Sequence, residues 1–280
     1  MRHVVLIACA ILSAAGCGAS SHIRSSAELT NTPLYTFNEQ ELDEYLQSLD
    51  TRRISLTRRV ERLARKNIGQ PYRLFLLGEF PHELYDPDPM YCLSASDCVT
   101  FVEHTYAMAF ACDWSSFFRT LQRIRYKDGA IGILTRNHFT EADWNVNNAW
   151  LFEDVTEGVA NGETRRMIVR VDRARFFAKY GLGQDIPIQR FETSYISRAS
   201  LPRCVSNLRT GDVIEIVRGT DDAPYVSHMG LCLRAGAECR LIHSAKPAVR
   251  EEGLLDYVKR HENVKGVKVL RVREEALDSI

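Results

Sequence analysis

The sequence predicts an α+β fold, in which helices formed early in the chain pack on an antiparallel sheet formed late in the chain. Two helical patterns lie near the N-terminus, and four β-rich segments separated by turn signals occupy residues 212–217, 225–233, 240–243 and 267–272. Helices followed by strands favour this class over alternating βα units. With 280 residues, the chain can bury one sizeable core, or one catalytic domain with an embellishment.

Residues 1–17 have the pattern of a signal peptide for export. A basic start precedes an apolar run from Val4 to Ala15, which is too short for a transmembrane helix, and small residues stand directly before Cys17. This arrangement resembles the cleavage site of bacterial lipoproteins, which implies lipidation at Cys17. We therefore expect a lipid-anchored protein on the periplasmic face of the cell envelope, at the outer membrane if the cell has two membranes. Secretion without a lipid remains the alternative.

The remaining chain divides into three parts. Residues 18–35 are rich in Ser, Thr and Ala and are interpreted as a tether. Residues 36–67 form a helical region, whose first helix is expected to begin with a capping box at Asn38. The main domain is expected over 68–280, with an inserted subdomain that includes a strand near 166–171.

Composition excludes several classes of partner. Equal numbers of acidic and basic residues, 36 of each, give no polyanion-binding surface, so we expect no nucleic acid. After the leader, six cysteines remain, and none has the Cys-x-x-Cys spacing of a zinc or redox site. We expect neither a metal nor a cofactor. An exported protein can form disulfides.

Cys98 is the candidate nucleophile. A helix is predicted to begin near Asp97, and a cysteine at a helix start is favoured as the thiolate, which is the reactive form. The alternative for Cys98 is a buried structural cysteine, the commoner role.

His228 is the candidate base, and His243 its orienting partner. A two-residue turn at Ala235-Gly236 would place His228 opposite His243 and Cys232 opposite Cys239, with Cβ atoms about 5 Å apart. His228 and His243 could then form a hydrogen bond, and the same register permits a disulfide. A one-residue slip would remove both pairings.

Residues 125–161 are expected to form a long structured loop, which in a compact domain is usually functional. A guanidinium binds a carboxylate bidentately, and an indole can cover a sugar or a peptide. The candidates for substrate recognition are therefore Arg136, His138, Asp143 and Trp144. Glu79 either binds substrate or caps a Pro-rich loop. For Arg136 and Asp143, the alternative to substrate binding is an ion pair that only ties down the 125–161 loop, and the sequence favours neither. A metal site at His138 and Asp143 lacks a third ligand.

Several motifs in order along the chain resemble the NlpC-type papain-like hydrolases and, more closely, the N-acetylmuramoyl-L-alanine amidase-like family. The shared features are Gly69-Gln-Pro-Tyr72, Leu77-Gly78-Glu79, Asp97-Cys-Val-Thr-Phe-Val-Glu103, Arg136-Asn-His-Phe139 with Asp143-Trp144, Arg209-Thr-Gly-Asp212, Ser227-His-Met-Gly230 and His243. The resemblance covers residues 68–272. Ser96 departs from it, since these families often carry an aromatic residue before Asp-Cys, and the shape of the pocket beside the nucleophile is therefore open.

The resemblance implies a papain-like fold, with Cys98 as nucleophile, His228 as base and His243 as third member. It also implies that Tyr72 and the backbone N–H of Cys98 stabilise the oxyanion. The expected substrate is peptidoglycan or its muropeptides, cut between the muramoyl lactyl group and L-alanine. Alternatives are cleavage between D-glutamate and the diamino acid, acyl transfer, and a non-catalytic envelope-binding lipoprotein.

Overall fold

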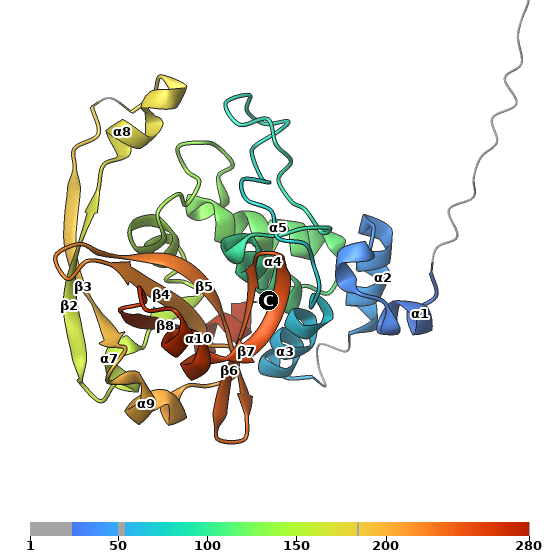
Figure 1. Ribbon diagram of the computed structural model, residues 1–280. Coiled ribbons are helices and arrows are strands. Elements are labelled where there is room, and N and C mark those ends of the chain that lie inside the picture. The colour runs from blue at the N-terminus through green and yellow to red at the C-terminus, as the bar shows by residue number, and fades with distance from the viewer. Residues whose placement is uncertain (1–23, 50–53, 184, 280) are drawn as a thin grey trace, which may run out of the picture.

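The computed structural model describes residues 24–49, 54–183 and 185–279 (Figure 1). The expected signal peptide and the predicted lipidation site Cys17 lie outside these ranges. Within them, no helix combines the length and apolar character needed to cross a membrane.

The N-terminal part consists of short helices packed beside the main domain. They are α1 (Ser26–Asn31), a 3₁₀ turn (Leu34–Thr36), α2 (Glu39–Ser48) and α3 (Leu56–Lys66). The capping box expected at Asn38 is confirmed, because its side chain accepts a hydrogen bond from the Glu41 N–H at 2.9 Å and the Glu41 carboxylate accepts one from the Asn38 N–H at 3.0 Å.

The tether expected over 18–35 is wrong for its described part. Ser25 caps α1, while Leu29 and Leu34 are fully buried in the main core. The Ser and Thr residues that suggested a linker act as caps and turn residues around these two leucines. Burial of the apolar side chains stabilises a folded segment where composition alone indicated a flexible one.

Two helices form the centre of the molecule. α4 (Cys98–Phe110) begins as predicted after Asp97, and α5 (Trp114–Arg125) follows it. The side chains of α4 from Thr100 to Phe110 are all buried, so this helix is surrounded by protein on every side. A helix fixed in this way holds its first residue, Cys98, in a defined place.

In the described part of the chain, eight strands form one antiparallel sheet in the order β2-β3-β8-β4-β5-β6-β7, with β1 also paired to β8. The strands are β1 (Phe152–Asp154), β2 (Thr164–Val171), β3 (Gln189–Ser197), β4 (Val213–Gly219), β5 (Pro224–Ala235), β6 (Glu238–Ala245), β7 (Ala248–Gly253) and β8 (Gly266–Val272). The strand expected near 166–171 is present as β2. The α+β class is therefore confirmed.

The sheet is covered on both faces (Figure 1). Met229, Leu231 and Ile242 face α4 in the main core, together with Phe101 and Val102 of that helix. The other face packs against α7 (Thr156–Val159), α9 (Leu201–Cys204) and α10 (Leu254–Arg260). Both faces of β5 and β6 are thus packed, and alternate side chains of each strand enter different environments.

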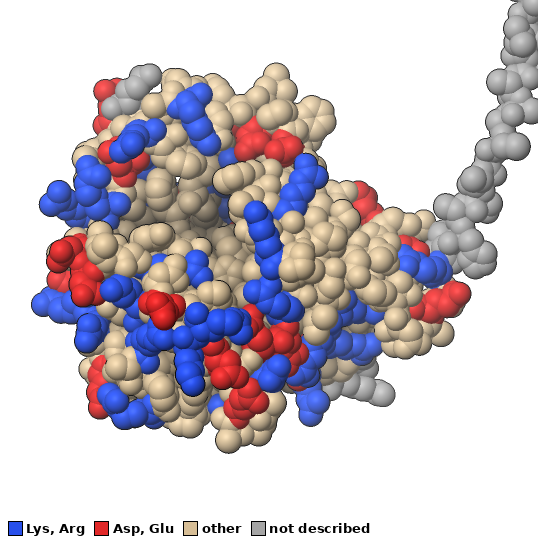
Figure 2. Space-filling view, viewed as in Figure 1, with Lys and Arg blue, Asp and Glu red and all other residues tan. Residues whose placement is uncertain are grey.

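The connection between β2 and β3 carries α8 (Arg173–Phe177) and a 3₁₀ turn (Ala178–Tyr180), and extends away from the rest of the sheet (Figure 1). The expected long loop at 125–161 contains a short 3₁₀ turn (Lys127–Gly129), a π-helical turn (Thr140–Trp144) and α6 (Asn145–Asn147). Figure 2 shows a hollow between the α8 end of the hairpin and the loops that precede α4.

Candidate active site

Cys98 is the first residue of α4 and is partly exposed. The Asp97 side chain caps the helix by accepting a hydrogen bond from the Thr100 N–H at 2.8 Å. The backbone N–H groups of Met229, Val99 and Cys98 lie close enough to the sulfur to lower the pKa of the thiol. Met229 lies on β5 directly after His228, so the end of the helix meets the sheet at the predicted base.

The charge state expected for Cys98 is not the one that its surroundings favour. Burial and the neighbouring Asp97 carboxylate raise the pKa of the Cys98 thiol to about 12, although the three backbone N–H groups act in the opposite direction. The prediction that the helix start favours the thiolate is therefore wrong for this resting state, because desolvation outweighs the helix terminus. The thiol form predominates until a base removes the proton.

Tyr72 lies near enough to Cys98 for the two side chains to interact electrostatically. Burial raises the pKa of the Tyr72 phenol, and the charge of Asp97 and that of an ionised Cys98 act in the same direction. The Tyr72 backbone pairs with Ser96 and donates a hydrogen bond to the Pro247 carbonyl at 3.0 Å. Tyr72 is thus held against both the nucleophile segment and the turn between β6 and β7.

Ser96 is buried in a polar network that fixes the nucleophile segment. Its hydroxyl donates to Gln70 Oε1 at 2.7 Å and lies 3.0 Å from the Ser244 hydroxyl. Ser244 in turn donates to the Ser96 carbonyl at 2.9 Å. This network ties the start of α4 to β6.

The predicted pair of histidines is joined, and the chain of contacts continues to a carboxylate. His228 Nε2 lies 2.7 Å from His243 Nδ1, and His243 Nε2 lies 2.9 Å from Glu252 Oε1. Burial, with a smaller effect of His243, lowers the pKa of His228 to about 3. Burial also lowers the pKa of His243 to about 4, against the effect of Glu252. Both rings are therefore neutral near pH 7.

The strand register behind this contact differs from the prediction by two residues. The turn uses Gly236 and Ala237, so Ala235 pairs with Glu238 and Cys232 with Leu241. Gly236 has a φ of 63°, a conformation that glycine adopts without strain at the first position of a tight turn. The predicted turn would have placed an alanine at that position.

Because the shift is an even number of residues, the two histidines stay on one face of the sheet. A Cβ added to Gly230 would lie 2.8 Å from His243 Cβ, so the missing side chain leaves the space through which His228 reaches His243 diagonally. Cys232 and Cys239, also diagonal, form a disulfide with Cα atoms 6.0 Å apart.

Glu252 escaped the sequence analysis because β7 carries no clear strand pattern. The signal that the sequence offers is the alternation of side chains along β7. Val249 faces the core, whereas Arg250 and Glu252 point to the other face beside α10. Tyr257 of α10 covers the relay there, with its ring centroid 5.3 Å from that of His243.

Two of the five residues predicted to contact substrate are buried. Glu79 is 0% exposed and Trp144 only 1%. The Trp144 indole N–H donates to Glu103 at 3.0 Å, and Glu79 accepts from the Tyr126 hydroxyl at 3.0 Å. Substrate contact is therefore a wrong assignment for Glu79 and Trp144, because neither side chain reaches the surface.

The other three residues hold the walls of the hollow together. Arg136 pairs with Glu79 at 3.2 Å and Asp86 at 2.8 Å, and donates to the Leu77 carbonyl. Asp143 forms an ion pair with Arg173 instead of Arg136. Ion pairs thus connect the 130–144 region to the loops before α4 and to α8, a structural role like the alternative left open from sequence.

His138 makes the same kind of connection. Its Nε2 lies 2.7 Å from the Ile133 carbonyl, and its ring packs on Phe176 with centroids 4.6 Å apart. Tyr85 and Tyr180 bring the two walls together directly, with ring centroids 6.4 Å apart. The hollow in Figure 2 is therefore bounded by segments that hold one another in position.

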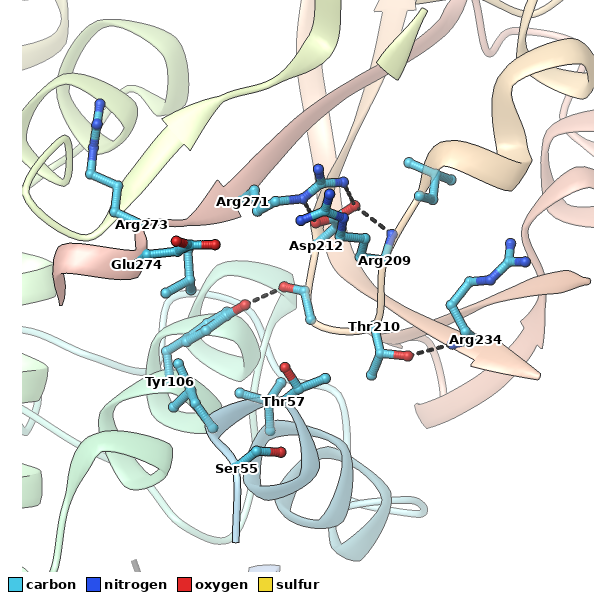
Figure 3. Close-up of a pocket in the computed structure, with 15 residues that line it drawn as sticks. Ser55, Thr57, Tyr106, Arg209, Thr210, Asp212, Arg234, Arg271, Arg273 and Glu274 are labelled. Carbon is cyan, nitrogen blue, oxygen red and sulfur yellow. Dashed lines mark hydrogen bonds and ion pairs between the residues drawn. The ribbon is translucent and has the colours of Figure 1, made fainter. Parts of the chain in front are cut away.

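A cavity of about 580 Å³ lies at the far end of α4 (Figure 3). Tyr106 lines it, about 12 Å along the helix from Cys98 at 1.5 Å per residue. Asp212 in its wall is paired with Arg271 at 2.7 Å, and Thr210 accepts a hydrogen bond from the Arg234 N–H. These groups are used within the protein, so we do not assign this cavity to catalysis.

No group of three or more His, Cys, Asp and Glu side chains in the described ranges is arranged to hold a metal ion. Cys98, His228 and His243 are residue types that can supply nucleophilic and acid–base chemistry.

Residues 62–267 match the family model described as N-acetylmuramoyl-L-alanine amidase-like. Among solved structures, a Legionella pneumophila protein is 23% identical with a TM-score of 0.75, over 84% of this chain and 94% of its own. An N-acetylmuramoyl-L-alanine amidase from Bacteroides uniformis is 25% identical with a TM-score of 0.62, over 75% of this chain and 97% of its own. No curated protein sequence matches the chain.

Proposed function

The chain belongs to the N-acetylmuramoyl-L-alanine amidase-like family, and we propose that it is a peptidoglycan hydrolase with Cys98 as nucleophile and His228 as general base. The observation that carries this proposal is the position of Cys98 at the start of α4, where the backbone N–H of Met229, the residue next to His228, is close enough to lower the pKa of the thiol. It supports a papain-like arrangement, in which a helix supplies the nucleophile and a sheet supplies the base. The proposed bond joins the muramoyl lactyl group to L-alanine.

The mechanism starts from a neutral pair. His228 withdraws the thiol proton of Cys98 as the sulfur attacks the amide carbonyl carbon. The tetrahedral intermediate collapses when the C–N bond breaks and the imidazolium of His228 gives its proton to the leaving amine. Water, deprotonated by His228, then hydrolyses the thioester and releases the free carboxylate and the thiol.

Oxyanion stabilisation is assigned to the Cys98 backbone N–H and the Tyr72 hydroxyl. The raised pKa of the Tyr72 phenol keeps it protonated and able to donate. Loss of one such donor typically costs about 3 kcal/mol of transition-state stabilisation.

The test is digestion of purified muropeptides by the full chain, read by mass spectrometry. Cys98→Ala is compared with Cys112→Ala, an exposed cysteine that serves as the matched control. Release of stem peptides with a free L-alanine N-terminus by the native chain and Cys112→Ala, but not by Cys98→Ala, is the expected result. Products ending at D-glutamate would move the bond but keep the nucleophile, and equal products from both variants would refute the assignment.

Transfer to an added amine instead of water would indicate the acyltransferase alternative, in which the same thioester forms. Binding of muropeptides without any product would favour the envelope-binding alternative. Both outcomes would contradict hydrolysis as the function of the site.

We also propose a lipid anchor at Cys17 on the periplasmic face of the envelope, based on the sequence of the leader. Metabolic labelling with a radioactive fatty acid should mark the native chain and not Cys17→Ser. Labelling of neither would support secretion without a lipid.

A further inference from the structure

We propose that Glu252 is a positioning residue that fixes the ring tautomers of His243 and His228, so that Nδ1 of His228 stays unprotonated. The inference rests on the proposed function, because it assigns a role to Glu252 within that same site. It adds a fourth member to the chain of nucleophile, base and orienting histidine.

The tautomers follow from the order of donors and acceptors. An ionised carboxylate only accepts hydrogen bonds, so the 2.9 Å contact with Glu252 places the proton of neutral His243 on Nε2. His243 Nδ1 is then an acceptor. The 2.7 Å contact requires His228 Nε2 to donate, which leaves the lone pair of His228 on Nδ1. This is the nitrogen left free to receive the thiol proton.

The carboxylate at the end of the relay is held in its ionised form. Burial of Glu252 acts to raise its pKa, but hydrogen bonds from Arg260, His243 and Arg250 together lower it to about 2. Arg250 Nε lies 2.9 Å from Glu252 Oε1, and Arg260 forms an ion pair with Oε2. Glu252 therefore accepts hydrogen bonds from three donors and is charged near pH 7.

The other groups that face the relay do not offer a competing acceptor to His228. The Tyr257 hydroxyl of α10 is occupied by Arg218 of β4 at 2.9 Å, and the Tyr257 ring stacks beside that of His228. His261 packs on Tyr257 with centroids 4.5 Å apart. His228 Nε2 is thus directed to His243 alone among these side chains.

Glu251 provides a matched control within the same strand. It also carries two arginine contacts, with Arg65 Nε and Arg240 Nε at 3.0 Å each, but these lie on the opposite face of β7. If Glu252 served only to hold ion pairs, replacing either glutamate would have similar consequences. If it sets the tautomers, only Glu252 will affect His228.

The first measurement is independent of catalysis. In two-dimensional ¹H–¹⁵N spectra of the histidine rings, His228 of the native full chain should show a protonated Nε2 and an unprotonated Nδ1. Glu252→Gln should give a mixture of tautomers at His243 and His228, because an amide can donate as well as accept, whereas Glu251→Gln should resemble the native chain. Native-like His228 signals in Glu252→Gln would overturn the proposal.

The second measurement is muropeptide cleavage. Glu252→Gln should lower kcat roughly 10- to 100-fold with little change in KM, by analogy with outer partners of functional histidines. Glu252→Asp, which keeps the charge, should recover part of the loss, and equal kcat values for Glu251→Gln and Glu252→Gln would contradict the proposal. If Cys98→Ala remains active, the proposed function fails, but the ring spectra still decide the role of Glu252.

Discussion

Asp97 has two separable effects on Cys98 and its helix, and two substitutions distinguish them. Its carboxylate caps α4 by accepting the Thr100 N–H, and its negative charge raises the pKa of the Cys98 thiol, second only to burial. Asp97→Asn keeps an acceptor for the cap and removes the charge. Asp97→Ala removes both.

Loss of the cap should reduce the free energy of unfolding by about 1 kcal/mol in Asp97→Ala, within a range of roughly 0.5–2 kcal/mol. For a chain of this size, that corresponds to a decrease in Tm of about 2–4 °C. Asp97→Asn should unfold close to the native chain, because Asn and Asp are comparable N-caps. Urea unfolding followed by circular dichroism measures these differences.

The effect on charge is measured by the pH dependence of Cys98 alkylation with iodoacetamide. Both variants should shift the alkylation midpoint to lower pH, because the thiolate no longer faces a neighbouring carboxylate. Asp113→Ala is the matched control, since Asp113 caps α5 through the Ser116 N–H at 2.7 Å. An unchanged midpoint in Asp97→Asn would refute the electrostatic reasoning, and equal destabilisation by Asn and Ala would refute the capping argument.

Three further predictions concern stability. Leu29→Ala should cost roughly 2–5 kcal/mol in urea unfolding, because Leu29 is fully buried, and a negligible loss would show that α1 does not contribute to the fold. Replacing Cys232 and Cys239 by Ala should cost roughly 2–3 kcal/mol for so short a loop, measured by thermal unfolding, without slowing Cys98 alkylation. Burial raises the pKa of Glu215 to about 8, so the native chain should lose stability as pH rises from about 4.5 to 8. Glu215→Gln should remove that loss. Identical pH profiles of the two chains in urea unfolding would contradict the prediction.

Local signals in the sequence predicted the elements that carry the nucleophile and the base. Asp97 before an apolar run predicted the start of α4, and alternating side chains around His228 predicted β5 and the face it presents. These predictions held because capping and alternation depend on neighbouring residues only. The motif resemblance added the family.

Contacts between distant segments were beyond such reasoning. Nothing near Arg136 in the sequence indicates that Glu79 and Asp86, about fifty residues away, would occupy its guanidinium. The sequence predicts substrate contact for Trp144, yet its indole N–H donates to the buried Glu103 carboxylate of α4. Pairings of this kind depend on how the loops cross, which no local pattern specifies.

The predicted β5–β6 register differs from the observed one by two residues, yet the two histidines still meet. A turn shifted by one residue would have sent His228 and His243 to opposite faces, whereas the observed shift of two residues preserves the face and changes only the partner. The side-chain contact then depends on Gly230, which stands opposite His243 and whose Cβ, if present, would lie 2.7 Å from the Ile242 carbonyl oxygen. An even register shift in the hairpin therefore keeps His228 and His243 on the same face of the sheet. The absence of a side chain at Gly230 then leaves room for the two rings to meet.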